Sequence, residues 1–247
     1  MCIAMCLLVA AIASSISLTA QGQAGGKWWA PGDGRTLPAN ADYANQDGAL
    51  GILNTAGPIE TKGHPFFEPI GSNGRACITC HQPSDAMSLS AATARERWGE
   101  TGGKDPLFAA IDGKNCPNLP QDDPASHSLL LNRGLIRVFL PWPPQNAAGT
   151  RVAPEFTIEV VRDPTGCNTD AQYGLASNNP TISVFRRPRM AANLKYVTAA
   201  AFGVSPFIVK NGQPAARDPE TGVLVSMNMM ADAREPTLRT QAVSAAV

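Results

Sequence analysis

The chain has 247 residues and a mass of 25.9 kDa, enough for one large domain or two small ones. Lysine and arginine total 20, as do aspartate and glutamate, so the formal net charge is zero. This balance excludes the basic excess that is typical of nucleic-acid-binding proteins, and no nucleic-acid partner is expected. Only 16% of residues are charged, with 22 glycines and 21 prolines, so we expect short helices joined by long ordered loops.

The N-terminus has the pattern of an export signal. Residues 1–20 contain no charged side chain, and the apolar run 6–13 is long enough for the core of a signal peptide but too short to span a membrane. We interpret residues 1–24 as a signal peptide, although the usual N-terminal positive charge is missing; a buried helix is the alternative. No later apolar stretch reaches the ~18 residues of a membrane span. Export implies the periplasm and an oxidising compartment.

The elements that follow are short. Residues 25–65 are rich in Gly, Ala, Asn and Pro with weak periodicity, which predicts an extended N-terminal arm with little regular structure. A first helix is expected over 91–100, because Ser90 is a good N-cap and Gly102 a good stop signal.

A second helix and a hairpin are predicted in the middle of the chain. The helix covers 124–132 and ends before Gly134. Residues 135–140 and 155–161 have strand patterns, and apolar and polar residues alternate in the second. We expect these two strands to pair as a β-hairpin inserted at about 135–162.

The segment Cys77-Ile78-Thr79-Cys80-His81 is a Cys-x-x-Cys-His motif. Two thiols one helical turn apart can add to the two vinyl groups of a haem, and the adjacent histidine can then ligate the iron. The motif therefore predicts one covalent haem c on Cys77, Cys80 and His81, with His81 as the ligand of the haem iron.

Two other uses of the motif are weighed against haem. A zinc site would need two further ligands at metal-binding spacing, which His64 and His127 do not supply. A thioredoxin-like redox pair would need a strand before the motif and a helix after it. Gly74 precedes the motif and Pro83 follows it closely, so neither element is expected.

Four cysteines remain once the signal peptide is removed. Cys116 and Cys167 lie outside the haem motif, and an even number of cysteines in an exported protein favours pairing. We predict a structural Cys116–Cys167 disulfide, whose loop of about 52 residues corresponds to ~4 kcal/mol in the chain-entropy model. Free reactive thiols are the alternative.

The sixth iron ligand is left open at this stage. A methionine or histidine there favours electron transfer, whereas an open position favours activation of a small molecule. Met87 is expected on the same side as His81, and His127 at the polar edge of the second helix. The candidates are Met87, Met190, Met227, Met229, Met230, His64 and His127.

Three blocks, in this order, resemble the bacterial di-haem cytochrome c peroxidase family, which includes the methylamine-utilisation di-haem enzyme. The first block contains the haem motif. The others match an Arg-x-Pro…Asn-Leu block and an Asp-x-Arg…Leu…Gln-Ala block of the family. The three blocks are Asn73 to Pro83, Arg186 to Leu194 and Asp232 to Ala242. A subgroup of the family is similar at Asp105 to Phe108 and at Asp112 to Pro117.

The resemblance implies a mainly α protein with a c-type cytochrome fold, long ordered loops and the small inserted β-hairpin. Residues 66–247 would form the first of two haem domains. His81 would be the proximal ligand, Gln241 a distal catalytic glutamine and Asn193 a calcium ligand. Calcium would then be a second cofactor. The implied partners are a redox protein that donates or accepts electrons, and hydrogen peroxide.

The chain also departs from the family. It has no second Cys-x-x-Cys-His motif, and Ala231 and Ala233 replace a bridging tryptophan and a glycine. A helix expected over 237–247 has no stop signal, which favours a fragment over a single-haem descendant. We therefore predict an exported electron-transfer haem protein, the N-terminal haem domain of a peroxidase-like oxidoreductase. The alternatives are a mono-haem electron carrier with a filled sixth position and a haem-free relic.

Overall fold

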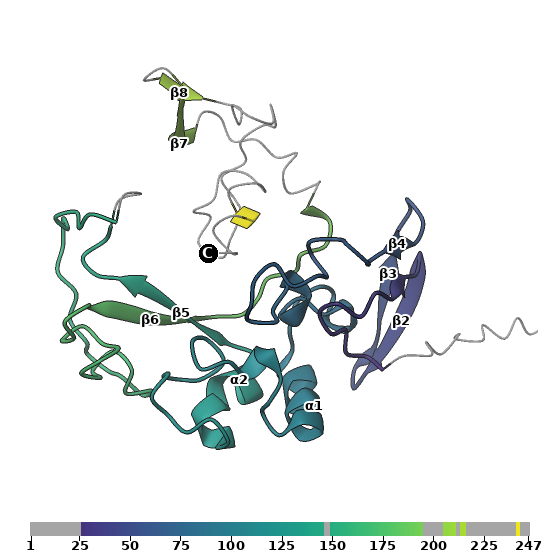
Figure 1. The fold of residues 1–247 in the computed structure, drawn as a ribbon, viewed down its shortest axis with the longest axis horizontal. Coiled ribbons are helices and arrows are strands. Elements are labelled where there is room, and N and C mark those ends of the chain that lie inside the picture. Colours follow the sequence, from purple (N-terminus) through teal and green to yellow (C-terminus); the bar gives the residue numbers. More distant parts are fainter. Residues whose placement is uncertain (1–25, 146–148, 195–204, 211–212, 216–240, 243–247) are drawn as a thin grey trace, which may run out of the picture.

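A computed structural model describes residues 26–145, 149–194, 205–210, 213–215 and 241–242 (Figure 1). In these residues two short α-helices have defined ends, α1 (Ala91–Thr101) and α2 (Ser128–Arg133). About 20% of the described residues are helical and about 19% are in strands. The prediction of a mainly α cytochrome fold is therefore wrong. The frequent glycines and prolines keep helices short, since each disfavours a helix interior.

Both predicted helices are confirmed, with their caps. The Ser90 side chain accepts the Thr93 N–H, and α1 ends at Gly102 with φ +58°. A 3₁₀ turn, η4 (Pro124–His127), leads into α2, which ends at Gly134 with φ +62°. These ends were predictable because capping depends on residues adjacent in sequence.

The N-terminal arm is more regular than predicted. β2 (Asn40–Asn45) and β3 (Gly48–Leu53) form an antiparallel hairpin, and β1 (Thr36–Leu37) pairs with β4 (Ile59–Glu60). Ala41 and Tyr43 are buried on one face of β2. The expectation of an irregular arm is wrong. Buried and exposed residues alternate in β2 over only a few positions, and the composition of its partner strand β3 does not indicate a strand.

The central ribbon has a different partner from the one predicted. β5 (Ile136–Pro141) is confirmed, but it pairs antiparallel with β6 (Thr181–Arg186) rather than with residues 155–161. Residues 155–161 form no strand, and Phe156 and Val161 are 64% and 95% exposed. Alternation of apolar and polar residues predicts a strand with one buried side. It does not show which part of the protein would cover that side. Two further strands, β7 (Ser205–Lys210) and β8 (Gln213–Ala215), also pair.

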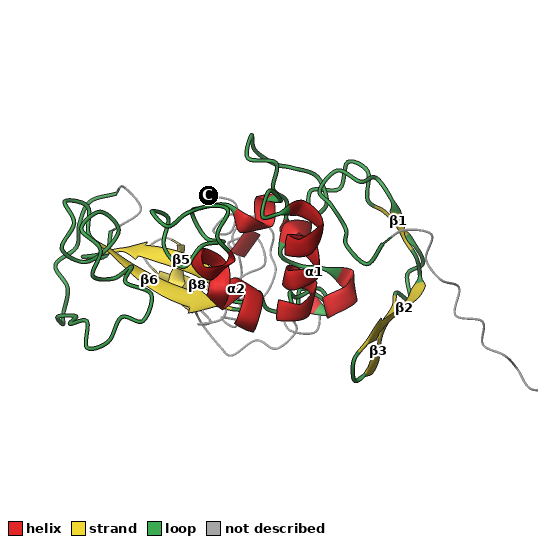
Figure 2. Ribbon diagram, turned by 90° about the horizontal axis from the view of Figure 1, so that it is seen from below, coloured by secondary structure: helices red, strands yellow, loops and turns green. Residues whose placement is uncertain are grey.

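The two helices lie in the middle of the molecule, with β5 and β6 on one side and β1 to β4 on the other (Figures 1 and 2). Two buried clusters form the core. The helical cluster contains Leu89, Ala94, Leu107, Phe108, Leu130 and Leu131. The N-terminal cluster contains Trp29, Leu37, Phe67 and Ile78. The Cys-x-x-Cys-His segment lies between these clusters.

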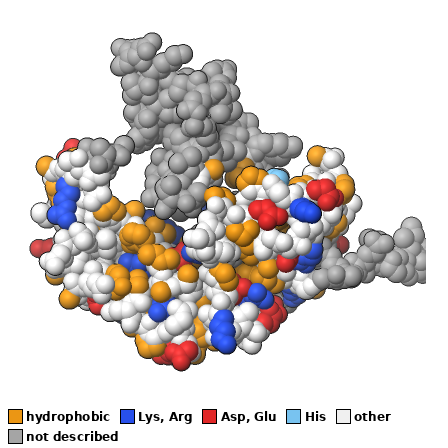
Figure 3. Space-filling view, in the orientation of Figure 1, with side chains coloured by type: hydrophobic (Ala, Val, Ile, Leu, Met, Phe, Trp, Pro, Cys, Tyr) orange, Lys and Arg blue, Asp and Glu red, His pale blue; other side chains and the backbone are white. Residues whose placement is uncertain are grey.

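The surface reflects the even charge balance of the sequence. On the face seen in Figure 3, basic and acidic side chains of the described residues are interspersed with hydrophobic ones. In the described part of the chain, no helix combines the length and apolar character needed to cross a membrane. The predicted signal peptide, residues 1–24, lies outside the described residues.

Candidate functional site

The motif begins in a 3₁₀ turn, η1 (Cys77–Thr79). The Cys80 N–H donates to the Cys77 carbonyl at 3.2 Å, and the Ala76 N–H donates to the Thr79 hydroxyl at 3.1 Å. Because a 3₁₀ helix has three residues per turn, side chains at i and i+3 lie on the same side. Cys77 and Cys80 therefore present their side chains to one side, and neither forms a disulfide.

The residues between the cysteines hold this turn in the core. Ile78 is fully buried in the N-terminal cluster, and its N–H donates to the Phe66 carbonyl at 3.0 Å. Cys80 packs against the helical cluster, while Cys77 is exposed. The motif is thus fixed by Ile78 and Cys80 while one sulfur stays accessible from the surface.

His81 is positioned by a backbone carbonyl. Its Nδ1 lies 2.8 Å from the Met87 carbonyl oxygen. A carbonyl oxygen can only accept, so the hydrogen bond to Met87 requires the ring proton on Nδ1, and in that tautomer Nε2 carries the lone pair. The Arg189 backbone carbonyl is a second acceptor beside the ring. Burial lowers the pKa of His81, against the opposing effect of the Met87 and Arg189 carbonyls. A neutral ring with a lone pair on Nε2 is the form that ligates a metal.

The loop after the histidine is held by one buried side chain, Gln82. Its Nε2 donates to the carbonyls of Ile78 at 2.6 Å and Trp29 at 3.0 Å, and its Oε1 accepts the Trp29 N–H at 2.8 Å. The Gln82 backbone N–H donates to the Ser88 carbonyl at 2.7 Å, and its carbonyl accepts the Met87 N–H at 2.9 Å. Gln82 therefore joins the N-terminal segment to the loop that orients His81.

The segment after β6 packs against the same loop. The Ala191 N–H donates to the Met87 carbonyl at 2.9 Å, and the Ser88 hydroxyl donates to the Pro188 carbonyl at 2.5 Å. The carbonyl that orients His81 is thus itself held by residues about a hundred positions later in the chain. The second sequence block, Arg186 to Leu194, thus packs against the loop that directly follows the first block.

The thiols of the motif have raised pKa values. Burial is the largest cause for both, and it raises the pKa of Cys80 to about 11, against the lowering effect of Arg75. Arg75 Nη2 lies 3.7 Å from Cys80 Sγ, and Arg75 Nη1 donates to Asp112 Oδ2 at 2.7 Å. A redox-active Cys-x-x-Cys pair needs a thiolate of lowered pKa, so this environment is unlike that of a thioredoxin-type site.

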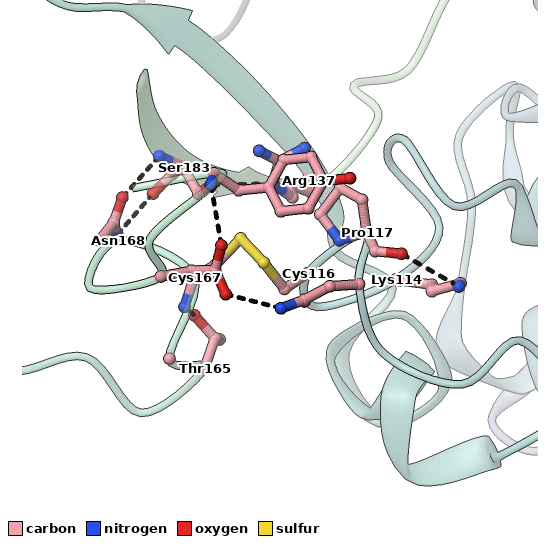
Figure 4. Close-up of a disulfide and its surroundings, with 12 residues drawn as sticks. Lys114, Cys116, Pro117, Arg137, Thr165, Cys167, Asn168 and Ser183 are labelled. Atoms are coloured by element: carbon pink, nitrogen blue, oxygen red, sulfur yellow. Dashed lines mark hydrogen bonds between the residues drawn. A yellow bond between two sulfur atoms is a disulfide. The ribbon is translucent and has the colours of Figure 1, made fainter. Parts of the chain in front are cut away.

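The second cysteine pair forms the predicted disulfide. Cys116 and Cys167 are bonded, with their Cα atoms 5.2 Å apart, and both are buried (Figure 4). Beside them Asn168 and Ser183 exchange two hydrogen bonds, and the Arg137 Nε donates to the Ser183 hydroxyl at 2.8 Å. The disulfide therefore joins the loop after α1 to the loop between β5 and β6.

The structure narrows the set of sixth-ligand candidates. His127 was expected at a polar edge but is fully buried, with Nδ1 2.9 Å from the Gly113 carbonyl and Nε2 3.1 Å from the Gln121 carbonyl. Both its nitrogens face backbone carbonyl oxygens inside the core, so neither is open to a haem iron. Met87 packs against the N-terminal cluster. His64 and Met190 are exposed, and Met227, Met229 and Met230 lie outside the described residues.

The two residues assigned by family resemblance stay predictions. Gln241 is helical and half-buried, but the residues on either side along most of the predicted helix 237–247 lie outside the described part. Asn193 is exposed, with φ +59°. In the described ranges no three His, Cys, Asp or Glu residues are grouped so as to hold a metal ion.

Comparisons with known proteins found no relative of this chain. Family models, curated proteins and solved structures each contain no significant match to this chain. The function must therefore be inferred from the residues of the site itself.

Three structural contributors to the site were not predicted from sequence: Gln82, the Met87 carbonyl and the Arg75–Asp112 pair. Gln82 has no sequence signal for burial, because a glutamine beside a proline is also typical of an exposed turn. Asp112 lies in a glycine-containing loop, 37 residues from Arg75. No local pattern indicates such a distant partner.

Proposed function

We propose that this chain is an exported, periplasmic c-type haem protein that transfers electrons. We further propose that it is the N-terminal haem domain of a di-haem, peroxidase-like oxidoreductase. One observation carries the proposal: two unpaired thiols lie on the same side of a 3₁₀ turn, and the Met87 carbonyl orients the adjacent His81.

The donor set of the site fits a covalently held haem. The Cys77 and Cys80 sulfurs would each form a bond to one carbon of a vinyl group, and the thiol hydrogen would move to the other carbon. No electrons are gained or lost in this addition, so it needs no oxidant. When bound, the haem supplies the one-electron chemistry of iron.

His81 would contribute the protein's iron ligand through Nε2. Its Nδ1–H bond to the Met87 carbonyl fixes the ring orientation and makes Nε2 a stronger donor, as second-sphere partners of metal-bound histidines do. The lowered pKa of His81 keeps the ring neutral near pH 7 and available for ligation. The loop held by Gln82 thus prepares the ligand before haem arrives.

The two competing uses of the motif are less well supported. A structural zinc site takes four protein ligands, and within the described ranges no group of three suitable residues is present. A haem needs only one protein ligand beside the thioethers. A redox dithiol would need lowered thiol pKa values, whereas burial raises the pKa of both cysteines here.

The test is the visible spectrum of the reduced protein, expressed with a haem-maturation system. We expect a c-type spectrum and haem that stays on the chain under denaturing conditions. The Cys77→Ala/Cys80→Ala variant should lose the covalent haem, and His81→Ala should keep it with an altered spectrum. Gln172→Ala, which shortens an exposed side chain away from the motif, is the control and should match the parent. A colourless parent protein would refute the proposal.

Carbon monoxide and peroxide then separate the two haem functions. A spectrum that shifts with carbon monoxide indicates an open sixth position, as a peroxidase-like domain requires. A spectrum that carbon monoxide leaves unchanged indicates a filled sixth position and supports the mono-haem carrier instead. We expect peroxide turnover by this chain alone to be weak, because only one haem motif is present.

A further inference from the structure

We propose that Arg75 and Asp112 set the reduction potential of the haem held by Cys77, Cys80 and His81, and that they act on it with opposite signs. This inference rests on the proposed function and adds two charged residues to the same site.

Arg75 lies beside the Cys80 sulfur, and Asp112 lies beside Arg75. Arg75 bridges the two groups: its Nη2 is 3.7 Å from Cys80 Sγ, and its Nη1 is 2.7 Å from Asp112 Oδ2. The Arg75 and Asp112 side chains are 17% and 20% exposed, so water screens their charges only partly. In the attached state Cys80 Sγ is a substituent of the porphyrin edge, so both charges lie close to the ring.

Arg137 of β5, which lies beside the disulfide, holds the backbone around Asp112 in place. The Asp112 carbonyl accepts the Arg137 N–H at 2.7 Å, and Arg137 Nη1 donates to the neighbouring Ile111 carbonyl at 2.8 Å. Asp112 Oδ1 is buried and has no hydrogen-bond partner among the described residues. Arg75 is therefore the group that compensates this carboxylate.

The contact with Cys80 also decides how Arg75 can act. A guanidinium beside the Cys80 sulfur would lie near the point where the haem is attached. Arg75 would therefore act on the haem through its charge. Reduction of Fe(III) to Fe(II) takes up one electron from the redox partner and lowers the positive charge of the site by one. A nearby positive charge favours the reduced state, and a nearby negative charge favours the oxidised state.

The experiment is a redox titration of the haem-loaded full chain, followed by its visible spectrum. Asp112→Asn leaves the Arg75 charge uncompensated and should shift the midpoint potential upward. Arg75→Gln should shift it downward, and the double variant should lie closer to the parent than either single variant. Arg75→Lys keeps the charge and should shift the potential less than Arg75→Gln does.

The control and a second readout separate charge from structural damage. Asp33→Asn removes a carboxylate that is likewise paired with an arginine, Arg35 at 2.9 Å, but in the N-terminal segment, and should leave the potential unchanged. Thermal unfolding of the haem-loaded variants is the second readout: opposite shifts of the potential together with similar melting temperatures in Arg75→Gln and Asp112→Asn would indicate charge rather than structural damage.

The outcomes distinguish this inference from the function on which it rests. A chain that attaches no haem refutes the proposed function, and this inference with it. A chain that attaches haem but whose potential does not move in either variant overturns this inference alone. Shifts of the same sign in Arg75→Gln and Asp112→Asn would also overturn it, because they would indicate loosened packing rather than charge.

Discussion

The two cysteine pairs of this protein differ in spacing, burial and bonding. Cys116 and Cys167 are separated by 51 positions, are buried and form a disulfide. Cys77 and Cys80 are three positions apart, remain thiols, and Cys77 is exposed. The first pair joins distant loops, whereas the second pair is not crosslinked: the Cys77 thiol is exposed and Cys80 packs against the helical cluster.

The surroundings of the two pairs differ in the same way. The disulfide lies among polar groups, Arg137, Asn168 and Ser183, whose hydrogen bonds link segments with little apolar core of their own. The Cys-x-x-Cys-His motif is held without a crosslink, by Ile78 in a hydrophobic cluster and by the hydrogen bonds of Gln82. A crosslink therefore stabilises the loop-rich part, and non-covalent contacts shape the part whose cysteines remain thiols.

Removal of the disulfide should have the largest effect on stability. The Cys116→Ser/Cys167→Ser variant should lose about 4 kcal/mol of unfolding free energy, because its unfolded chain regains the freedom of a loop of roughly fifty residues. Urea denaturation would measure this loss. Cys77→Ser/Cys80→Ser in the haem-free protein is the matched control and should lose far less. Equal losses in the two variants would contradict the difference between the pairs.

Gln82→Ala should have the next largest effect on stability, and it acts in the region of the Cys-x-x-Cys-His motif. It leaves the Trp29 N–H and the Ile78 and Trp29 carbonyls without their buried partner, which should cost about 3 kcal/mol of unfolding free energy. Haem attachment should fall as well, because the His81 loop loses its support. Gln172→Ala, at an exposed position, should change stability by less than about 0.5 kcal/mol.

Two glycines, one in a tightly packed loop and one in an open part of α1, should respond to alanine in opposite ways. A Cβ at Gly113 would lie 2.6 Å from the backbone of Leu107 and Phe108, so Gly113→Ala should destabilise the protein by about 2 kcal/mol. Gly99 lies within α1 and has open space around it, so Gly99→Ala should stabilise by up to about 1 kcal/mol. Thermal unfolding of the two variants should give melting-temperature shifts of opposite sign.

Acid should lower the unfolding free energy of the haem-free protein through the protonation of two histidines, His81 and His127. Burial lowers the pKa of His81 and of His127 below the usual value of about 6.5. The unfolded chain therefore takes up protons first, and stability present above pH ~6.5 is lost as the pH falls through that value. Urea denaturation at several pH values from 8 to 5 should show this loss. His127→Gln should flatten the profile, and the exposed His64→Gln is its control.

The sequence alone predicted the features that depend on neighbouring residues. Ser90 and Gly102 marked the ends of α1, and Gly134 marked the end of α2. The Cys-x-x-Cys-His spacing identified the candidate site, and the even cysteine count indicated the Cys116–Cys167 disulfide. Capping, motif spacing and cysteine parity are all readable without knowing which distant segments meet.

Only the tertiary structure decided the features that depend on distant contacts. It paired β5 with β6, buried His127 and placed the backbone of Ala191 on the Met87 carbonyl that orients His81. It also made the overall fold a mixture of short helices and small ribbons, because helices this short depend on their packing. Gln82 and Trp29 are 53 positions apart, so their contact forms only when the two segments fold against each other.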